Sequence, residues 1–380
     1  MKRVIIVGAG IAGLATALRL RQIGWDPLVV ERAPARRTGG FAVVFSGMGY
    51  GAAERIGILP ELTRRAARGY DFAYLTRNGR PRFKVPASML FRMIGDDALT
   101  MLRGDLEAVL YEAADAEIRF GTTVTGVSQD AGGVEVTFGD GTVERADLLV
   151  GADGLHSTVR KLVFGPERDF LVDLGHMVGA LNLERLPDGA AEGSFSTVSE
   201  VGRTFVVADL GGGRVAGYFI YGCPDTGAEL ALGPGRALRR AFPGPRWAVT
   251  DLLGGLDEDA LYFDGVAQIV MDRWSRGRVV LVGDAAWCVS LFGGYGSSLA
   301  VGGADLLATT LEAHPDDLGA ALAAWEAGLR AEVADRQRRG RANIAAHAPR
   351  NRLELAIQQL PLRLAAVPPV AHLLRRHHAA

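Results

Sequence analysis

Residues 2–32 constrain the fold more strongly than any other part of the chain. An apolar run at residues 4–7 predicts a strand that is buried on both faces. Apolar residues at helical spacing then predict a helix over residues 11–23, and a second apolar run at residues 28–30 predicts another buried strand. A strand, a helix and a strand in this order predict the first unit of a parallel α/β sheet.

Three glycines occupy the turn between the first strand and the helix, in the spacing G-x-G-x-x-G. Gly8 suits a tight turn, Gly10 lets the backbone approach a pyrophosphate, and Gly13 lets the helix pack closely on the strand. Glu31 ends the second strand about 20 residues later, where an acidic side chain accepts a hydrogen bond from a ribose hydroxyl. Glycine makes up 50 of the 380 residues, so the motif alone also fits an ordinary turn in a parallel sheet. With all parts in register, the stretch predicts a dinucleotide site and leaves open whether the ligand is FAD or NAD(P).

The composition argues against several classes of protein. The net charge is −1, which gives no electrostatic reason to expect nucleic acid as a partner. Cys223 and Cys288 are too few for a disulfide framework, so we expect a reducing, cytoplasmic environment. No Cys/His cluster predicts a metal site, and no Ser/His/Asp arrangement predicts a hydrolase. The first strand leaves no room for a signal peptide, and no run of about 18 apolar residues predicts a transmembrane segment.

The order of the predicted elements indicates a nucleotide-binding domain that a β-rich domain interrupts twice. A hairpin around Asn78-Gly79, alternating runs over residues 175–222 and a strand at 266–271 predict the β-rich part. Residues 117–150 predict a β-meander, and a long helix is expected over 318–347. We expect the nucleotide-binding domain at residues 1–66, 95–172 and 270–350, the β-rich domain at 67–94 and 173–269, and a C-terminal helical segment at 351–380.

Two further segments follow buried strands and contain glycine beside aspartate. Residues 151–160 include Asp153-Gly154, and residues 283–296 begin with Gly283-Asp284. Together with the N-terminal motif, these segments resemble the signatures of the group A FAD-dependent aromatic hydroxylases, which have the para-hydroxybenzoate hydroxylase fold. The pattern is nearest to tetracycline-inactivating and polyketide-tailoring members. The resemblance covers roughly residues 1–60, 98–165 and 275–310. It implies an α/β protein with a Rossmann-like FAD-binding domain, an inserted β-sheet-rich substrate domain and C-terminal helices.

The resemblance also implies how FAD is held without a covalent bond. Glu31 would bind the adenosine ribose, Arg103 would contact the flavin region, and Asp284 would hold the ribityl or pyrophosphate part. The turn at 293–296 would present backbone N–H groups to the isoalloxazine ring. The residues assigned to cofactor binding in this way are Gly8, Gly10, Ala12, Gly13, Glu31, Arg32, Arg36, Arg103, Asp153, Asp284, Gly294 and Gly296.

Some of these roles carry alternatives. Asp153 and Arg160 would support both nucleotides, although Asp153 and Asp284 could instead cap helices at the sheet edge. Either Arg36 or Arg37 would meet NADPH, or both belong to a solvated basic loop.

The implied activity is that of an NAD(P)H-dependent monooxygenase. NAD(P)H would reduce FAD and bind only transiently, because the chain has no second G-x-G-x-x-G unit. O2 would add at flavin C4a, and the hydroperoxide would oxygenate a polycyclic aromatic or polyketide-like molecule. The protein would be a monomer or a homodimer. The family often needs no protein nucleophile, so no catalytic side chain is assigned. The residues that could line the substrate cavity, or simply pack in the core, are Phe195, Phe205, Tyr218, Ile220, His176 and Arg203.

Several positions depart from the family pattern. Trp287 replaces the usual histidine after G-D-A-A, and Ser290 and Leu291 replace two prolines beside the reactive edge of the flavin. Tyr295 and Ser298 replace a common glutamine and asparagine. These departures motivate a second hypothesis, a non-redox cyclase that retains FAD. A third hypothesis is a nucleotide-binding module without enzymatic activity.

Overall fold

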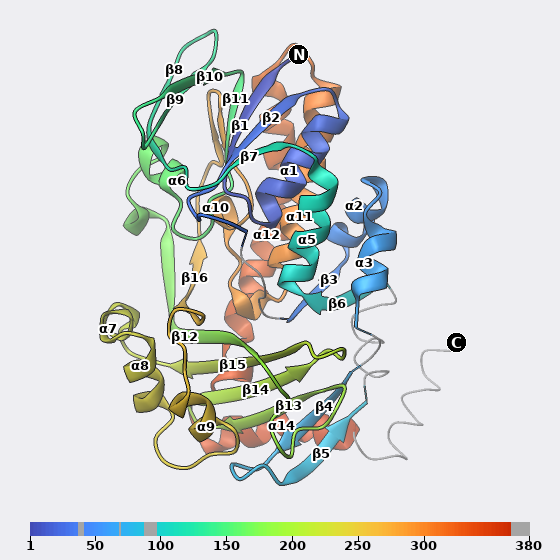
Figure 1. Cartoon of the computed structure of the whole chain (residues 1–380), viewed down its shortest axis with the longest axis vertical. Helices are drawn as coiled ribbons and strands as arrows, with labels where there is room; N and C mark the ends of the chain where they lie inside the picture. Colours follow the sequence, from blue (N-terminus) through green and yellow to red (C-terminus); the bar gives the residue numbers. More distant parts are fainter. Residues whose placement is uncertain (37–41, 68–69, 87–96, 366–380) are drawn as a thin grey trace.

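A computed structural model of the chain describes residues 1–36, 42–67, 70–86 and 97–365. Two sheets dominate the molecule (Figure 1). The main sheet and its helices form the upper part of the view, and a second, larger sheet lies below them. Arg37, the end of the region expected to form the hairpin and the last part of the predicted C-terminal segment lie outside the described residues.

The main sheet has six strands in the order β17-β18-β11-β1-β2-β7, and all neighbours except β17 and β18 are parallel. Its strands are β1 (Arg3–Val7), β2 (Asp26–Val30), β7 (Glu117–Arg119), β11 (Leu148–Gly151), β17 (Ser275–Arg276) and β18 (Val279–Leu281). The predicted strands at 4–7 and 28–30 are thus confirmed as neighbours. Strand β7 corrects the expected meander, because it extends the main sheet beside β2. Only β8 (Val124–Gln129), β9 (Val134–Phe138) and β10 (Val143–Ala146) form the meander, as a separate three-stranded sheet.

Helices cover the main sheet and connect its strands. Helix α1 packs against both α5 and α11, and α11 packs against α12, as Figure 1 shows. Together with the sheet they enclose one hydrophobic core that includes Ile5, Leu149 and Leu307. The helices of this part are α1 (Ile11–Gln22), α2 (Met48–Arg55), α3 (Leu59–Arg65), α5 (Arg103–Ala114), α6 (Thr158–Val163), α10 (Asp284–Trp287), α11 (Gly296–Ala313), α12 (Leu318–Ala342) and α13 (Ile344–His347). Two short 3-10 helices are η1 (Glu167–Asp169) and η2 (Leu291–Gly293).

The second sheet has seven strands in the order β16-β12-β15-β14-β13-β4-β5. They are β4 (Asp71–Leu75), β5 (Pro81–Val85), β12 (Leu171–Leu183), β13 (Ser194–Glu200), β14 (Arg203–Asp209), β15 (Val215–Gly222) and β16 (Tyr262–Ile269). Helices α7 (Thr226–Leu232), α8 (Pro234–Ala241) and α9 (Val249–Gly254) follow β15. The hairpin predicted around Asn78-Gly79 is present as β4 and β5, which pair antiparallel.

The two faces of the second sheet have different partners. Phe205, Phe219 and Tyr221 share a core with residues of α8 and α9 such as Leu238 and Val249, which defines the outer face. The alternate residues of the strands form the inner face, which turns toward the main sheet. There, Tyr218 joins a core with Leu102 of β6 (Ala98–Leu102), the strand that pairs with β3 (Ala42–Ser46).

Helix α14 (Arg352–Ala365) lies beside β5 and continues through Pro361, where the sequence suggested a break. Pro361 leaves the carbonyl group of Ile357 without its helical donor. Because Ile357 is exposed, water can satisfy that carbonyl group. None of the helices in the described ranges combines the length and the apolar character that crossing a bilayer requires.

Candidate cofactor site

The three glycine-containing segments meet at the carboxyl ends of β1, β11 and β18. These strands are parallel neighbours, so the loops that follow them lie along one edge of the sheet. A methyl group at Gly8, which has a φ of 108°, would lie 2.5 Å from the carbonyl oxygen of Ala152. One at Gly283 would lie 2.6 Å from Cβ of Ala12, and one at Gly13 would overlap the carbonyl oxygen of Gly8. The loops therefore pack so closely that no side chain fits at these three positions.

Glu31 holds the glycine-rich turn from the end of β2. Its carboxylate accepts hydrogen bonds from the backbone N–H groups of Ala9, at 2.9 Å, and Ala33, at 2.8 Å. Each carboxylate oxygen retains a free lone pair, and the side chain is only half-buried. The position fits the predicted contact with a ribose hydroxyl.

Arg103, the first residue of α5, lies over the glycine-rich turn. One of its terminal nitrogens is 3.5 Å from the place that Cβ would occupy at Gly10. The other is 2.7 Å from a carboxylate oxygen of Glu107, one helical turn later. Burial raises the pKa of Glu107, and the charges of Arg103 and, to a lesser degree, Arg36 oppose this effect. Glu107 is not among the residues assigned above from the resemblance, although its spacing of four residues from Arg103 is typical of a helical ion pair.

Arg32 and Arg36 lie on the surface beside this site. Both side chains are exposed, and the guanidinium group of Arg36 stands 5.4 Å from the centre of the Tyr111 ring. Arg36 thus lies beside α5, the helix that Arg103 begins, and its charge acts on Glu107.

Asp284 begins α10 directly after Gly283. Protein atoms crowd its carboxyl group, and this loss of solvation raises its pKa, while the charge of Arg103 and a hydrogen bond with Cys288 lower it. The side chain is nevertheless open to solvent, whereas Gly283 and Ala285 are buried. Because the Asp284 carboxyl group is open to solvent, it can accept hydrogen bonds from hydroxyl groups of a ligand.

Gly294 and Gly296 form the turn from η2 into α11. Gly294 has a φ of 59°, and Gly296 is the first residue of the helix. The place of a Cβ at Gly296 is 3.9 Å from a carboxylate oxygen of Asp284, so the start of α11 is a direct neighbour of that side chain. The first N–H groups of a helix have no partner within it and can bind a ligand.

Asp153 and Arg160 join two of the segments. The Asp153 carboxylate accepts hydrogen bonds from the backbone N–H groups of Thr158, at 2.6 Å, and Val159, at 3.1 Å, so it caps the start of α6. The fully buried Arg160 donates to the carbonyl oxygens of Ala285, at 3.0 Å, and Leu155, at 2.6 Å. These contacts fit the helix-cap alternative for Asp153 and tie the Asp153-Gly154 segment to α10.

Three of the departures from the family pattern have a packing explanation. Trp287 is buried, and its ring centre lies 4.9 Å from that of Trp274 and 5.6 Å from that of Trp325. The hydroxyl groups of Tyr295 and Ser298 accept hydrogen bonds from Met48, at 2.9 Å, and Ser46, at 3.0 Å. The side chain of Trp287 therefore faces the core. Ser290 and Leu291 remain in the loop between Asp284 and Gly294.

Strand alternation separates the residues expected to line a substrate cavity. Phe205 belongs to the core of the outer face, and Arg203 on the same strand donates to the carbonyl oxygen of Ala241 in α8. Both residues therefore lie away from the main sheet, and Phe205 packs in the core, which is the second of the two alternatives given for it above. Tyr218 and Ile220 lie on the inner face, and Ile220 packs with Phe292 of η2.

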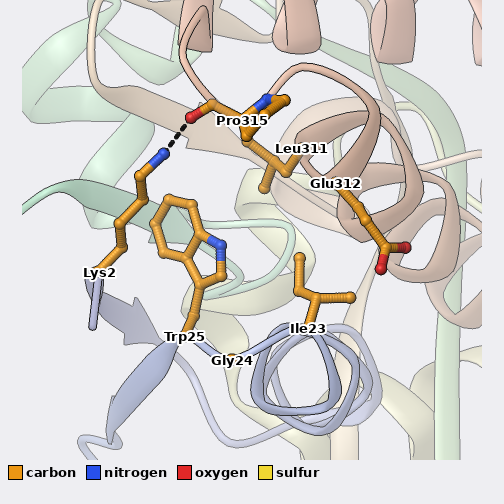
Figure 2. A pocket seen from close by; sticks show the side chains of 7 residues that line it. All are labelled: Lys2, Ile23, Gly24, Trp25, Leu311, Glu312 and Pro315. Atoms are coloured by element: carbon orange, nitrogen blue, oxygen red, sulfur yellow. Dashed lines mark hydrogen bonds between the residues drawn. The ribbon is translucent and has the colours of Figure 1, made fainter.

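Figure 2 shows a hollow elsewhere on the main sheet, at the amino end of β1. It is about 250 Å³ in volume and is lined by Lys2, Ile23, Gly24, Trp25, Leu311, Glu312 and Pro315. The Lys2 ammonium group donates to the carbonyl oxygen of Pro315 and lies 5.5 Å from the centre of the Trp25 ring. None of the predicted site residues lines this hollow. Within the described ranges, no group of His, Cys, Asp or Glu side chains is arranged to hold a metal ion.

The residues at the carboxyl edge of the main sheet fit FAD. Gly10, in the glycine-rich turn, is uncovered apart from Arg103, which supplies a positive charge beside it. Glu31, which follows β2, and Asp284, which follows β18, supply hydrogen-bond acceptors. These are the groups that a pyrophosphate flanked by polyhydroxyl chains requires.

Comparison with known proteins agrees with this fit. The family described as "FAD binding domain" matches residues 1–185 and 261–344. A flavin-dependent monooxygenase from an unknown prokaryotic organism is 30% identical over 321 residues, which cover 83% of this chain and 82% of the relative.

Two solved structures have the same fold over nearly the whole chain. The crystal structure of the tetracycline destructase Tet(51) is 28% identical, covers 97% of this chain and 98% of its own, and has a TM-score of 0.81. The structure of Klebsiella pneumoniae HpxO in complex with FAD and uric acid is 26% identical, covers 95% and 92% of the two chains, and has a TM-score of 0.78. The chain therefore belongs to the family of group A FAD-dependent aromatic hydroxylases, and it is a flavoprotein monooxygenase that binds FAD.

Proposed function

We propose that this monooxygenase consumes NAD(P)H and O2 to add one oxygen atom to a polycyclic aromatic or polyketide-like small molecule. The observation that carries the proposal is the convergence of Gly10, Arg103 and Asp284 on one edge of the main sheet. The chain has one G-x-G-x-x-G unit, at Gly8–Gly13, and FAD would occupy it permanently. NAD(P)H would then bind only for the time of electron transfer.

Each end of FAD would meet residues that already have a suitable geometry. Glu31 would accept from the adenosine ribose, and the start of α1 with Arg103 would face the pyrophosphate. Asp284 would accept from the ribityl hydroxyl groups, and the N–H groups near Gly294 and Gly296 would face the ring. FAD supplies electron transfer and activation of O2, and the protein orients the substrate and excludes water.

The substrate would lie between this edge and the inner face of the second sheet. Support comes from an aromatic cluster on that face, in which the ring of Phe195 lies 4.6 Å from that of Tyr70 and 5.1 Å from that of Phe72. A flat aromatic substrate is compatible with such a surface. The similarity to Tet(51), a tetracycline destructase, supports a polycyclic substrate.

We also propose that the chain forms two domains and is located in the cytoplasm. Residues 1–66, 95–172 and 270–350 would form the FAD-binding domain, and residues 67–94 and 173–269 the substrate domain. Cys223 and Cys288 are both free thiols, which is typical of a reducing compartment.

The proposal is tested by incubating the purified protein with NADH or NADPH, a panel of phenolic polyketides, and O2 labelled with a heavy isotope. We expect one candidate to accelerate NAD(P)H oxidation and to gain a single labelled oxygen atom. Product that forms without O2 and without NAD(P)H would contradict the proposal and would support the non-redox cyclase.

A further inference from the structure

The segment at residues 288–291, here called the flavin-side loop, has an unusual conformation. It connects α10 to η2, and so it lies between Asp284 and Gly294, two residues that we propose contact FAD. Ser290 in this loop has a φ of 72° and a ψ of 160°, a region that only glycine adopts easily. Its side chain is 7% exposed, and its hydroxyl group has no hydrogen-bond partner. The loop is therefore strained and carries a buried polar group that nothing satisfies.

Two buried glutamine side chains hold the loop from behind. The amide nitrogen of Gln268, on β16, donates to the carbonyl oxygen of Val289 at 3.2 Å and to that of Gln337 at 2.9 Å. The amide nitrogen of Gln337, on α12, donates to the carbonyl oxygens of Ile269 at 2.8 Å and Cys288 at 3.4 Å. These two side chains are 0% and 7% exposed, so water does not compete for their hydrogen bonds.

A glycine of α12 completes the support. A methyl group at Gly340 would lie 2.7 Å from the carbonyl oxygen of Val289 and 2.9 Å from the hydroxyl oxygen of Ser290. The last turns of α12 therefore press directly on the loop backbone, and any side chain at this position would displace it.

We propose that Gln268, Gln337 and Gly340 are positioning residues, which hold the flavin-side loop in its strained conformation and so set Asp284 and Gly294 on either side of the flavin. A strained conformation persists only where its surroundings determine it fully, and here three residues on β16 and α12 do so. The loop carbonyl groups point to the glutamines, which leaves the opposite side of the loop to the cofactor. This inference rests on FAD binding at the proposed site.

Two substitutions with opposite effects on stability test the inference. Gly340→Ala pushes the loop forward, and Ser290→Gly removes both the strain and the unsatisfied hydroxyl group. For FAD-loaded protein we measure the visible flavin spectrum and the midpoint potential, and for the same protein after FAD removal the affinity for added FAD and the melting temperature. Gly328→Ala is the matched control, because it lies on the same helix and its methyl group would meet only the end of the Leu306 side chain.

We expect Gly340→Ala to weaken FAD binding at least fivefold and to shift the flavin spectrum. Ser290→Gly should leave the melting temperature unchanged or higher and still weaken FAD binding at least threefold, because the released loop explores other conformations. Gly328→Ala should change none of the flavin properties. The inference is overturned if FAD affinity, spectrum and potential stay unchanged in both loop variants. It is also overturned if these flavin properties in Ser290→Gly change only as its melting temperature changes. An unsubstituted protein that binds no FAD would instead overturn the proposed function, and this inference with it.

Discussion

The two ends of the candidate FAD site are built in different ways. At the nucleotide end, the hydrogen bonds of Glu31 and the close contact of Gly13 with Gly8 lie within one strand–helix–strand segment, and Gly8 also contacts the distant Ala152. At the flavin end, Ser290 is strained, and the side chains that support its loop come from β16 and α12. The nucleotide end therefore depends mainly on local sequence, whereas the flavin end depends on contacts between distant elements. Substitutions at the two ends should therefore fail in different ways.

The largest effect is expected from Gly13→Ala at the nucleotide end. The added methyl group would overlap the carbonyl oxygen of Gly8, so α1 must move away from β1. We expect the free energy of unfolding to fall by about 3 kcal/mol. The purified protein should contain no FAD, as the ratio of flavin to protein absorbance would show. Gly254→Ala is the control, because nothing lies within 4 Å of its added methyl group. Gly13→Ala protein that binds FAD normally would contradict the account of this end.

Trp287→His tests whether the residue after G-D-A-A belongs to the flavin end or to the core. The substitution removes the contacts with Trp274 and Trp325 and buries an imidazole, so we expect a loss of about 2 kcal/mol in the free energy of unfolding. Urea unfolding measures this loss. The folded protein should keep an unchanged flavin spectrum. A changed spectrum without a loss of stability would put Trp287 at the flavin.

Only part of this site can be predicted from the sequence. The strands at 4–7 and 28–30, the glycine-rich turn and the acceptor Glu31 follow from local spacing, because short-range sterics decide them. The packing of Trp287 does not follow from local spacing, because its partners Trp274 and Trp325 are distant in the sequence.

The same limit applies to two other parts of the fold. The sequence places β7 in the meander, because alternation in three residues does not reveal that the partner is β2. Phe205 and Tyr218 both follow an alternating pattern, and only the position of α8 and α9 decides that Phe205 faces outward. The hydrogen bonds that Gln268 and Gln337 donate to the flavin-side loop likewise have no local signal, since two glutamines in a sequence do not indicate a shared buried contact.

Asp284→Asn sharpens the comparison by changing one acceptor that connects the two ends. The amide keeps the size of the side chain but loses the charge that strengthens hydrogen bonds from ligand hydroxyl groups. We expect FAD affinity to fall about tenfold, which corresponds to about 1.4 kcal/mol, with little change in melting temperature. Fluorescence titration of the FAD-free protein measures this change. Asp169→Asn, at an exposed carboxylate of η1, should leave the affinity as it is. Equal affinities in the Asp284→Asn and Asp169→Asn proteins would remove Asp284 from the site.

His156 gives the smallest expected effect and tests the segment between the two ends. Its ring nitrogens lie 3.0 Å from a carboxylate oxygen of Glu167 and 3.3 Å from one of Asp264 on β16. The Asp264 carboxylate, followed by that of Glu167, raises the pKa of His156 to about 9, although partial burial opposes them. Because the folded state favours the cation, the stabilisation is complete below the ordinary pKa of 6.5 and disappears as the pH rises through about 9.

The variant His156→Gln should therefore be less stable than the unsubstituted protein near neutral and slightly acidic pH. Half of the side chain is exposed, so we expect a difference of only about 0.5 kcal/mol. Urea unfolding over a pH series measures this difference, which should vanish above the raised pKa. A difference that grows with pH would contradict the assignment of the charged form.

The most direct test of the central claim is anaerobic reduction of the FAD-loaded protein. NADPH or NADH is added without O2, with and without a candidate phenolic substrate, and the visible flavin band is followed before O2 is admitted. We expect that the band bleaches, that it returns with O2, and that the substrate then carries one new oxygen atom. The opposite result is a flavin that neither NADPH nor NADH reduces, whether or not a substrate that the protein converts is present. This result would contradict the claim that this protein is an NAD(P)H-dependent monooxygenase.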